Sequence, residues 1–425
     1  MNSKVFKILG PGILFASTAI GVSHLVQSTR AGADYGFTLL WAILLANLFK
    51  YPFFEFGSRY ASTKGKSIID GYAGMSKWML YLYLLITLGT MFFVSAAVCA
   101  VTAGFLQNLF GLKAIFGENS TLYTNSILII FGAATLILGK YKTLDSIIKL
   151  IGITLLISTL AAFTLTLWNG PVSEGELFGD FSWKGSDALF LIALMGWMPT
   201  AVDLSAWNSL WTLERIEQTN YKPSLKETIR EFNFGYLVSA FLSVCFLTLG
   251  TYIMFDSGET LSGSGAVFAS QVVTLFTSSI GEWSYIIIAA ASFSIMLGTF
   301  IAVMDGYGRA LSRTATLVLK KEKDTSKAYN ISLLLTASGA FGLIYYYLIS
   351  AQNGQGFKSL VDVATTLSFL VAPFIAIANY SLVTNKDFPA HGKPPKWLRV
   401  LSVLGILFLV IFSIFGSIEI YKLYF

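Results

Sequence analysis

Residues 10–37 read GPGILFASTAIGVSHLVQSTRAGADYGF. The stretch is long enough to cross a membrane, but its middle, from Gly21 to His24, interrupts an otherwise apolar helix. Gly21 relaxes the backbone, Ser23 competes for backbone hydrogen bonds, and His24 is one of only two histidines in the chain. A polar interruption at bilayer depth is tolerated only where protein or a water-filled cavity surrounds it. The stretch therefore predicts either the broken helix of a transport site or a small-residue packing notch against a neighbouring helix.

The composition of the whole chain is that of a helical membrane protein. Of its 425 residues, 55% are hydrophobic and 12% are charged, and the mean hydropathy is +0.68. A soluble protein of this length carries about twice that charge. The two cysteines, Cys99 and Cys245, both lie in apolar segments, which favours packing roles over a disulfide or a metal site. We therefore predict an all-α polytopic membrane protein.

Hydropathy predicts eleven spans and charge predicts their orientation. The outer side of the predicted topology keeps only five of the 29 basic residues, so the net charge of +6 does not indicate a nucleic-acid partner. The positive-inside rule puts the amino terminus in the cytoplasm and the carboxyl terminus outside. We expect a monomer in the lipid bilayer of a bacterial inner membrane. The spans are 11–29, 37–57, 78–110, 123–139, 147–168, 188–212, 232–255, 283–308, 330–350, 360–384 and 396–424.

A second interruption lies in the sixth span, where residues 195–200 read MGWMPT. Pro199 removes a backbone donor and clashes with the preceding turn, and Gly196 loosens that turn. The interruption comes five spans after the first, as an inverted repeat of five plus five spans requires. We predict a LeuT-type fold in which helices 1 and 6 are broken. Residues 1–168 would form the first repeat, residues 169–384 the second, and residues 385–425 a loop and the additional span 11.

Several segments resemble the Nramp family of proton-coupled divalent metal transporters. They are residues 9–37, the stretch GKYKTLDSIIK at 139–149, and Met198-Pro199, together with the eleven-span pattern and the long outer loop before span 8. The resemblance covers nearly the whole chain. It implies a LeuT-like architecture and a secondary transporter that works by alternating access.

Most of the residues that bind metal and carry protons in that family are replaced here, although the methionine and proline of the span 6 motif are kept. The family's Asp-Pro-Gly-Asn in span 1, Met-Pro-His in span 6 and acidic pair in span 3 define the positions to compare. A backbone carbonyl three residues before the methionine is a further family ligand. The span 1 motif aligns with Gly21, Val22, Ser23 and His24, and the span 6 motif with Met198, Pro199 and Thr200. The acidic pair aligns with Ser95 and Val98, and the carbonyl position is Met195. The resemblance therefore implies the scaffold but not the family's ligand set.

We predict that substrate binds between the two interruptions, where the available side chains are uncharged. A divalent cation that loses its water at the bilayer midplane needs negative charge or many oxygen ligands. Imidazole and thioether suit a soft or borderline ion, so His24 and Met198 are candidate metal ligands. Packing roles remain open for both, because methionine fills core gaps and a lone buried histidine is usually a hydrogen-bonded neutral ring. The candidate site is Gly21, Ser23, His24, Met195, Met198 and Thr200.

Charged residues inside the predicted spans are the remaining candidates. Asp203, expected about one turn beyond Pro199 in the second half of span 6, is a functional hypothesis by default. It would bind a cationic group, carry a coupling proton or pair with a basic residue. Lys50, Glu55 and Arg59 in span 2 are predicted to form a gate or structural network near the inner end.

Three hypotheses for function follow. The first is transport of a metal ion through a rebuilt ligand set, and the second is transport of a small organic solute such as an amine or amino acid. The third is a non-transporting, receptor-like protein on the same scaffold. The sequence has no phosphate-binding Gly-Lys-Ser/Thr motif, and two histidines offer no Ser-His-acid arrangement. We therefore expect neither an enzyme nor a bound cofactor.

Overall fold

The computed structural model describes residues 11–139, 141–258, 260–321, 324–350 and 355–424. The side chains of residues 141–153, which hold most of the Nramp-like stretch at 139–149, lie outside the described set. Within the described ranges the chain forms helices and no sheet. In chain order these are α2 (Pro11–Ala19), η1 (Ser23–Ser28), α3 (Thr29–Tyr35), η2 (Phe37–Leu39), α4 (Leu40–Lys64), α5 (Ile68–Met75), α6 (Lys77–Phe110), α7 (Leu112–Phe116), η3 (Gly117–Asn119), α8 (Ser120–Ile137), α9 (Tyr141–Asn169), α10 (Gly185–Gly196), α11 (Leu204–Thr219), α12 (Leu225–Ile253), α13 (Gly265–Ile280), η4 (Glu282–Ser284), α14 (Tyr285–Val318), α15 (Ser326–Ile344), η5 (Tyr345–Ser350), α16 (Gly356–Thr384), η6 (Ala390–Gly392) and α17 (Lys396–Tyr424).

The predicted all-α membrane architecture is confirmed. Eight of the described helical segments are long and apolar enough to cross a membrane. The predicted spans 1 and 6 are each divided into shorter helices, and span 5 corresponds to α9. A helix thus stands at every predicted span, while the number of eleven membrane crossings stays a prediction.

The first predicted span is broken where the sequence indicated. Helix α2 ends at Ala19, the backbone bends at Ile20 and Gly21, and the chain resumes as the π-helical turn η1 followed by α3. The helix runs on to Tyr35, where Gly36 ends it with a φ of 59°. The helical segment therefore extends six residues beyond the predicted edge of span 1 at residue 29. Arg30, assigned to an outer loop, is a buried residue of α3.

The sixth predicted span is broken over a longer stretch. Helix α10 ends at Gly196, α11 begins at Leu204, and residues 197–203 between them are not helical. Asp203 is consequently the residue that precedes α11, not a residue one turn inside a continuing helix. Its expected position is corrected because the break extends four residues beyond Pro199.

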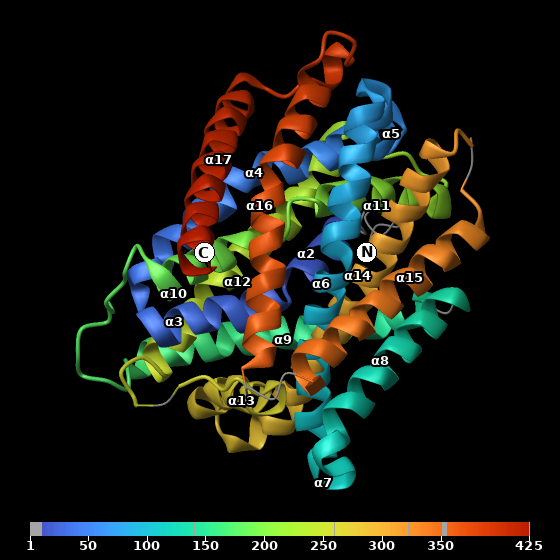
Figure 1. Ribbon diagram of the computed structural model, residues 1–425. Coiled ribbons are helices and arrows are strands. Elements are labelled where there is room, and N and C mark those ends of the chain that lie inside the picture. The colour runs from blue at the N-terminus through green and yellow to red at the C-terminus, as the bar shows by residue number, and fades with distance from the viewer. Residues whose placement is uncertain (1–10, 140, 259, 322–323, 351–354, 425) are drawn as a thin grey trace.

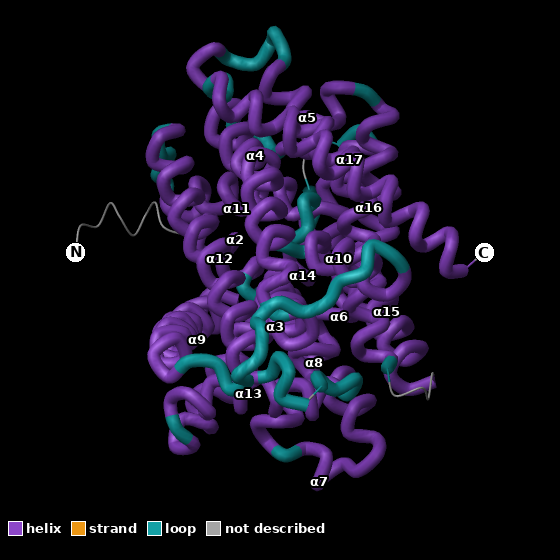
Figure 2. Tube along the Cα trace, turned by 90° about the vertical axis from the view of Figure 1, so that its left-hand side faces the viewer, coloured by secondary structure: helices purple, strands orange, loops and turns teal. Residues whose placement is uncertain are grey.

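The two broken helices lie inside a bundle. Helix α12 packs against α2, α3 and α4, while α6 packs against α14 and α16, and α11 packs against α4. Figure 1 shows α5 and the connection from α16 to α17 at one end of the molecule and α7 and α13 at the other. The loop between α9 and α10 runs across the side of the bundle, as Figure 2 shows in teal, and Phe37 donates its backbone N–H to Leu177 at 2.8 Å. The long loop before the predicted span 8 contains the helix α13.

Candidate functional site

The two breaks meet at a small cavity between α6 and α14. The cavity has a volume of about 20 Å³, which is enough for one water molecule or one small ion. The polar groups on its wall are hydroxyls, and the rest of the wall is apolar. The lining residues are Thr18, Val22 and Ser23 from the first break, Trp197, Thr200, Ala201 and Leu204 from the second, Val94 and Val98 from α6, and Thr299 and Val303 from α14.

The second break is organised around the ammonium group of Lys50. This side chain extends from α4, is fully buried, and donates to four backbone carbonyl oxygens in and beside the break. We call these four carbonyls the carbonyl cage. The Nζ–O distances are 2.8 Å to Met195, 2.8 Å to Gly196, 3.0 Å to Met198 and 3.0 Å to Thr200.

The carbonyl cage requires a charged lysine. Carbonyl oxygens only accept hydrogen bonds, so a neutral amine, with two N–H groups and a lone pair, would face four acceptors with too few donors. The ammonium form has three N–H groups and serves four acceptors when one N–H is shared. Helix α10 ends here, so the carbonyls of its last turn have no partner within the helix and carry the negative end of its dipole. Lys50 therefore acts as the cap of α10.

Asp203 supplies negative charge beside this lysine. Its carboxylate is 4% exposed and interacts with the Lys50 charge through space. The Tyr307 hydroxyl, which also lies 3.3 Å from the Thr90 hydroxyl, donates to Oδ2 of Asp203 at 3.3 Å. Oδ1 has no hydrogen-bond partner among the described residues. One oxygen of a buried carboxylate is thus available for a proton, a water molecule or a cation.

The first break is held by close packing and by neutral hydrogen bonds. A Cβ atom on Gly21 would lie 2.9 Å from the Thr299 methyl group, so α14 approaches the bend closely. The fully buried His24 ring lies with Nε2 2.8 Å from the Ser239 carbonyl oxygen and Nδ1 2.7 Å from the Ser23 hydroxyl. Because a carbonyl only accepts, Nε2 carries a hydrogen, while the Ser23 hydroxyl, which lies beside Nδ1, also donates to the Ala19 carbonyl at 2.6 Å. Both ring nitrogens are therefore engaged inside the protein.

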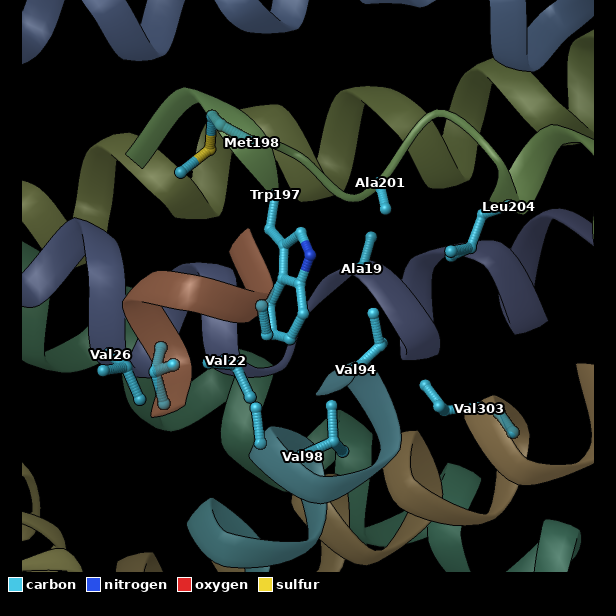
Figure 3. Close-up of a cluster of buried hydrophobic side chains, with 14 of the residues drawn as sticks. Ala19, Val22, Val26, Val94, Val98, Trp197, Met198, Ala201, Leu204 and Val303 are labelled. Carbon is cyan, nitrogen blue, oxygen red and sulfur yellow. The ribbon is translucent and has the colours of Figure 1, made fainter. Parts of the chain in front are cut away.

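The neighbouring side chains of Trp197 and Met198 in the second break point in different directions. Figure 3 shows the Trp197 indole extending toward Val94 and Val98, whereas the Met198 side chain does not point toward these two valines. Trp197 Nε1 donates to the Ser368 hydroxyl at 2.8 Å, which fixes the ring against α16. Met198 is fully buried and is not among the residues that line the cavity. Its thioether packs, and its carbonyl belongs to the carbonyl cage.

Ion pairs lie on both sides of the cavity. Toward the end that holds α13, Arg30 of α3 donates to the Asp362 carboxylate of α16 at 2.6 and 3.2 Å and to the Gln27 amide oxygen at 3.0 Å. Toward the other end, Arg59 pairs with Glu55. The network predicted for span 2 is present for these last two residues. Lys50, which was assigned to the same network, lies instead at the second break.

The structure thus brings together part of the predicted site. Ser23 and Thr200 line the cavity, Gly21 lies against α14 beside it, and Met195 contributes a carbonyl that Lys50 holds. His24 and Met198 do not line it. The predicted set of site residues did not include Thr299, Trp197 or Lys50. A lysine in the middle of an apolar span was the available signal for Lys50, because such a residue faces protein rather than lipid.

Comparison with known proteins assigns the chain to a family. The family model for natural resistance-associated macrophage protein-like (Nramp) proteins matches residues 12–419. The chain belongs to the Nramp family. It is 34% identical to an uncharacterised protein of Pasteurella multocida over 96% of this chain and 91% of the relative. It is 20% identical to the divalent metal cation transporter MntH of Listeria welshimeri over 97% of this chain and 89% of that protein.

Solved structures agree with that assignment. A mutant of the manganese transporter from Eremococcus coleocola superposes with a TM-score of 0.71 at 15% identity, covering 98% of this chain and 87% of that structure. This likeness shows the fold, and the predicted LeuT-type architecture and Nramp resemblance are confirmed. The family assignment also confirms the predicted class, a membrane transporter and not an enzyme.

Within the Nramp scaffold this chain has an unusual centre. Among the described residues no group of three or more His, Cys, Asp or Glu side chains is placed to hold a metal ion. The backbone carbonyl that the resemblance implies as a metal ligand, that of Met195, accepts a hydrogen bond from Lys50. The polar wall of the cavity consists of hydroxyl groups.

Proposed function

We propose that this Nramp protein is a secondary active metal-ion transporter whose cation passes through the hydroxyl-lined cavity between the two helix breaks. The observation that carries the proposal is the meeting of both breaks at this cavity in a chain of the Nramp family. Related proteins are named as divalent metal cation and iron transporters.

The lining favours a hard cation. Hydroxyl and water oxygens suit ions such as Mg²⁺ and Mn²⁺, whereas the soft candidates, the His24 ring and the Met198 thioether, do not line the cavity. An organic solute is the less favoured cargo, because the relatives named above are metal transporters.

We further propose Asp203 as the coupling group, because it is a buried carboxylate with one oxygen unpartnered among the described residues. We also propose that the protein is a monomer in a bacterial inner membrane, with its amino terminus in the cytoplasm. The repeat boundaries are proposed to lie at residues 168 and 384. The charge distribution of the loops supports the orientation.

Uptake into proteoliposomes tests this function. We expect Mg²⁺ or Mn²⁺ to enter, and uptake to respond to a pH gradient if Asp203 carries the coupling proton. Thr200→Val removes one hydroxyl from the cavity with little change of volume, and we expect a several-fold loss of metal uptake. Thr87→Val is the matched control, because Thr87 does not line the cavity and its hydroxyl donates to the Tyr83 carbonyl of its own helix.

The competing hypotheses predict different results in the same assay. Uptake of amino acids from a test panel without any metal uptake would favour the organic solute. Absence of uptake for every metal and amino acid, with folded protein in the vesicles, would favour the receptor-like protein. A Na⁺ gradient that drives uptake where a pH gradient does not would exclude proton coupling through Asp203.

A further inference from the structure

We propose that the carbonyl cage is a monovalent-cation site and that the Lys50 ammonium fills it as a tethered cation in place of a free ion. The inference concerns a site next to the transport cavity, and it holds whichever substrate is transported. It starts from the four contacts of one fully buried nitrogen with four backbone oxygens.

The cage has the chemistry of a cation site. Rings of backbone carbonyls replace the hydration shell of monovalent ions in membrane proteins, and unwound helix segments coordinate such ions in transporters. Here the carbonyls come from the last turn of α10 and from residues 198 and 200 of the unwound segment. All four point at a single cationic atom. The end of α10 adds the negative end of a helix dipole.

The distances select the class of cation. The cage places its oxygens 2.8 to 3.0 Å from the central nitrogen. Oxygen ligands lie roughly 2.3–2.6 Å from Ca²⁺ and about 2.0–2.1 Å from Mg²⁺, so a divalent ion would need a tighter cage. Potassium resembles ammonium in size and charge and therefore fits best, with the smaller Na⁺ second.

The charges around the cage also favour a cation in it. Asp203 is buried beside the cage and interacts with the Lys50 charge without a direct ion pair. Four acceptors and a carboxylate in a low-dielectric interior need a compensating positive charge. Lys50 supplies it, because α4 places the ammonium group among the four carbonyls of the break. A transporter with a resident cation at this break does not need to take up an ion from solution to hold the unwound segment.

Replacing the tethered cation tests the proposal. Lys50→Met keeps the apolar stem and leaves the cage free for an ion. Thermal unfolding of purified protein in detergent, followed by the fluorescence of its nine tryptophans, is measured while choline chloride is exchanged for KCl or NaCl at constant ionic strength. We expect the midpoint of Lys50→Met to rise by several degrees and to saturate with K⁺, and less strongly with Na⁺. Wild type should respond to neither exchange.

Two matched variants complete the design. Lys64→Met lies at the end of the same helix, where an exposed Nζ donates to the Asp387 carbonyl, and it should behave as wild type does. Lys50→Arg keeps the charge and should show no cation response. No divalent metal is present, so the result is independent of the metal-transport proposal.

Three results would overturn the inference. One is a folded Lys50→Met protein that unfolds at the same temperature in all three chlorides. Another is failure to recover folded Lys50→Met in any of them, because a free cation would then be no substitute for the side chain. The last is wild type that gains as much stability from K⁺ as the variant does.

Discussion

Both helix breaks interrupt a predicted membrane span, but different interactions stabilise them. The first break is short, with one bend at Ile20 and Gly21, and neutral contacts hold it. The second extends over residues 197–203, and a buried ammonium group holds it. One break therefore depends on shape and the other on charge.

This difference explains how an Nramp scaffold is maintained without the family's anionic ligand. Unwound backbone at membrane depth leaves carbonyls that must find partners. At the second break Lys50 satisfies four of them at once. At the first break the π-helical turn η1 continues the helix almost immediately, so few carbonyls are exposed. The longer break consequently needs the cation.

The largest effect should follow from removing the negative partner of that cation. Asp203→Asn keeps the shape of the side chain but leaves the buried Lys50 charge uncompensated. We expect the free energy of unfolding, measured by SDS denaturation in mixed micelles, to fall by about 3 kcal/mol or more. Adding Lys50→Met removes that charge, so the double variant should lose less stability than the two single variants together, in choline chloride, where no ion replaces the ammonium group. Purely additive effects would show that the two residues do not interact.

Asp362 provides a matched carboxylate with which the loss of stability at Asp203 can be compared. Asp362→Asn makes the same chemical change at an ion pair with Arg30, but the Asp362 side chain is 33% exposed. Exposed pairs contribute roughly 0–1 kcal/mol, so this variant should lose about 1 kcal/mol or less. An equal loss in both variants would contradict the special role of charge at the second break.

Glycine substitutions compare the packing of the two breaks directly. A Cβ on Gly196 would lie 2.0 Å from the backbone oxygen of Thr365, whereas a Cβ on Gly21 would lie 2.9 Å from the side chain of Thr299. Backbone yields less than a side chain does, so Gly196→Ala should lower the free energy of unfolding by about 3 kcal/mol and Gly21→Ala by about 1 kcal/mol. Gly89→Ala, which meets nothing within 4 Å, is the control and should be neutral or slightly stabilising. Equal losses at the two breaks would reject this ranking.

Both breaks could be located from the sequence because residue types mark them. Gly21 and Pro199 each disturb a helix in a way that does not depend on the rest of the fold. The extent of the second break could not be predicted, because no residue type at 200–203 marks these positions as non-helical. Asp203 was therefore expected one turn inside a helix that starts after it.

The partner of the second break could not be predicted for a different reason. Backbone carbonyls carry no residue-type signal, so nothing near Met195 or Thr200 in the sequence points to Lys50, which lies 145 and 150 positions away. Spacing within span 2 favoured an association with Glu55 and Arg59 instead, and only those two residues pair. The orientation of His24 depends on η1, because a π-helical turn shifts the side-chain register that an α-helix would give.

The smallest effect should come from His24, and it separates a packing histidine from a metal ligand. His24→Gln removes the imidazole, which lies between the Ser239 carbonyl and the Ser23 hydroxyl. Losing one buried hydrogen bond should lower the free energy of unfolding by about 1 kcal/mol. Metal uptake should keep its KM, because neither nitrogen is available to the cavity, whereas Thr200→Val should impair uptake without a comparable loss of stability. A rise in KM for His24→Gln that exceeds the effect of Thr200→Val would return His24 to the ligand set and give the first break a chemical role beside its structural one.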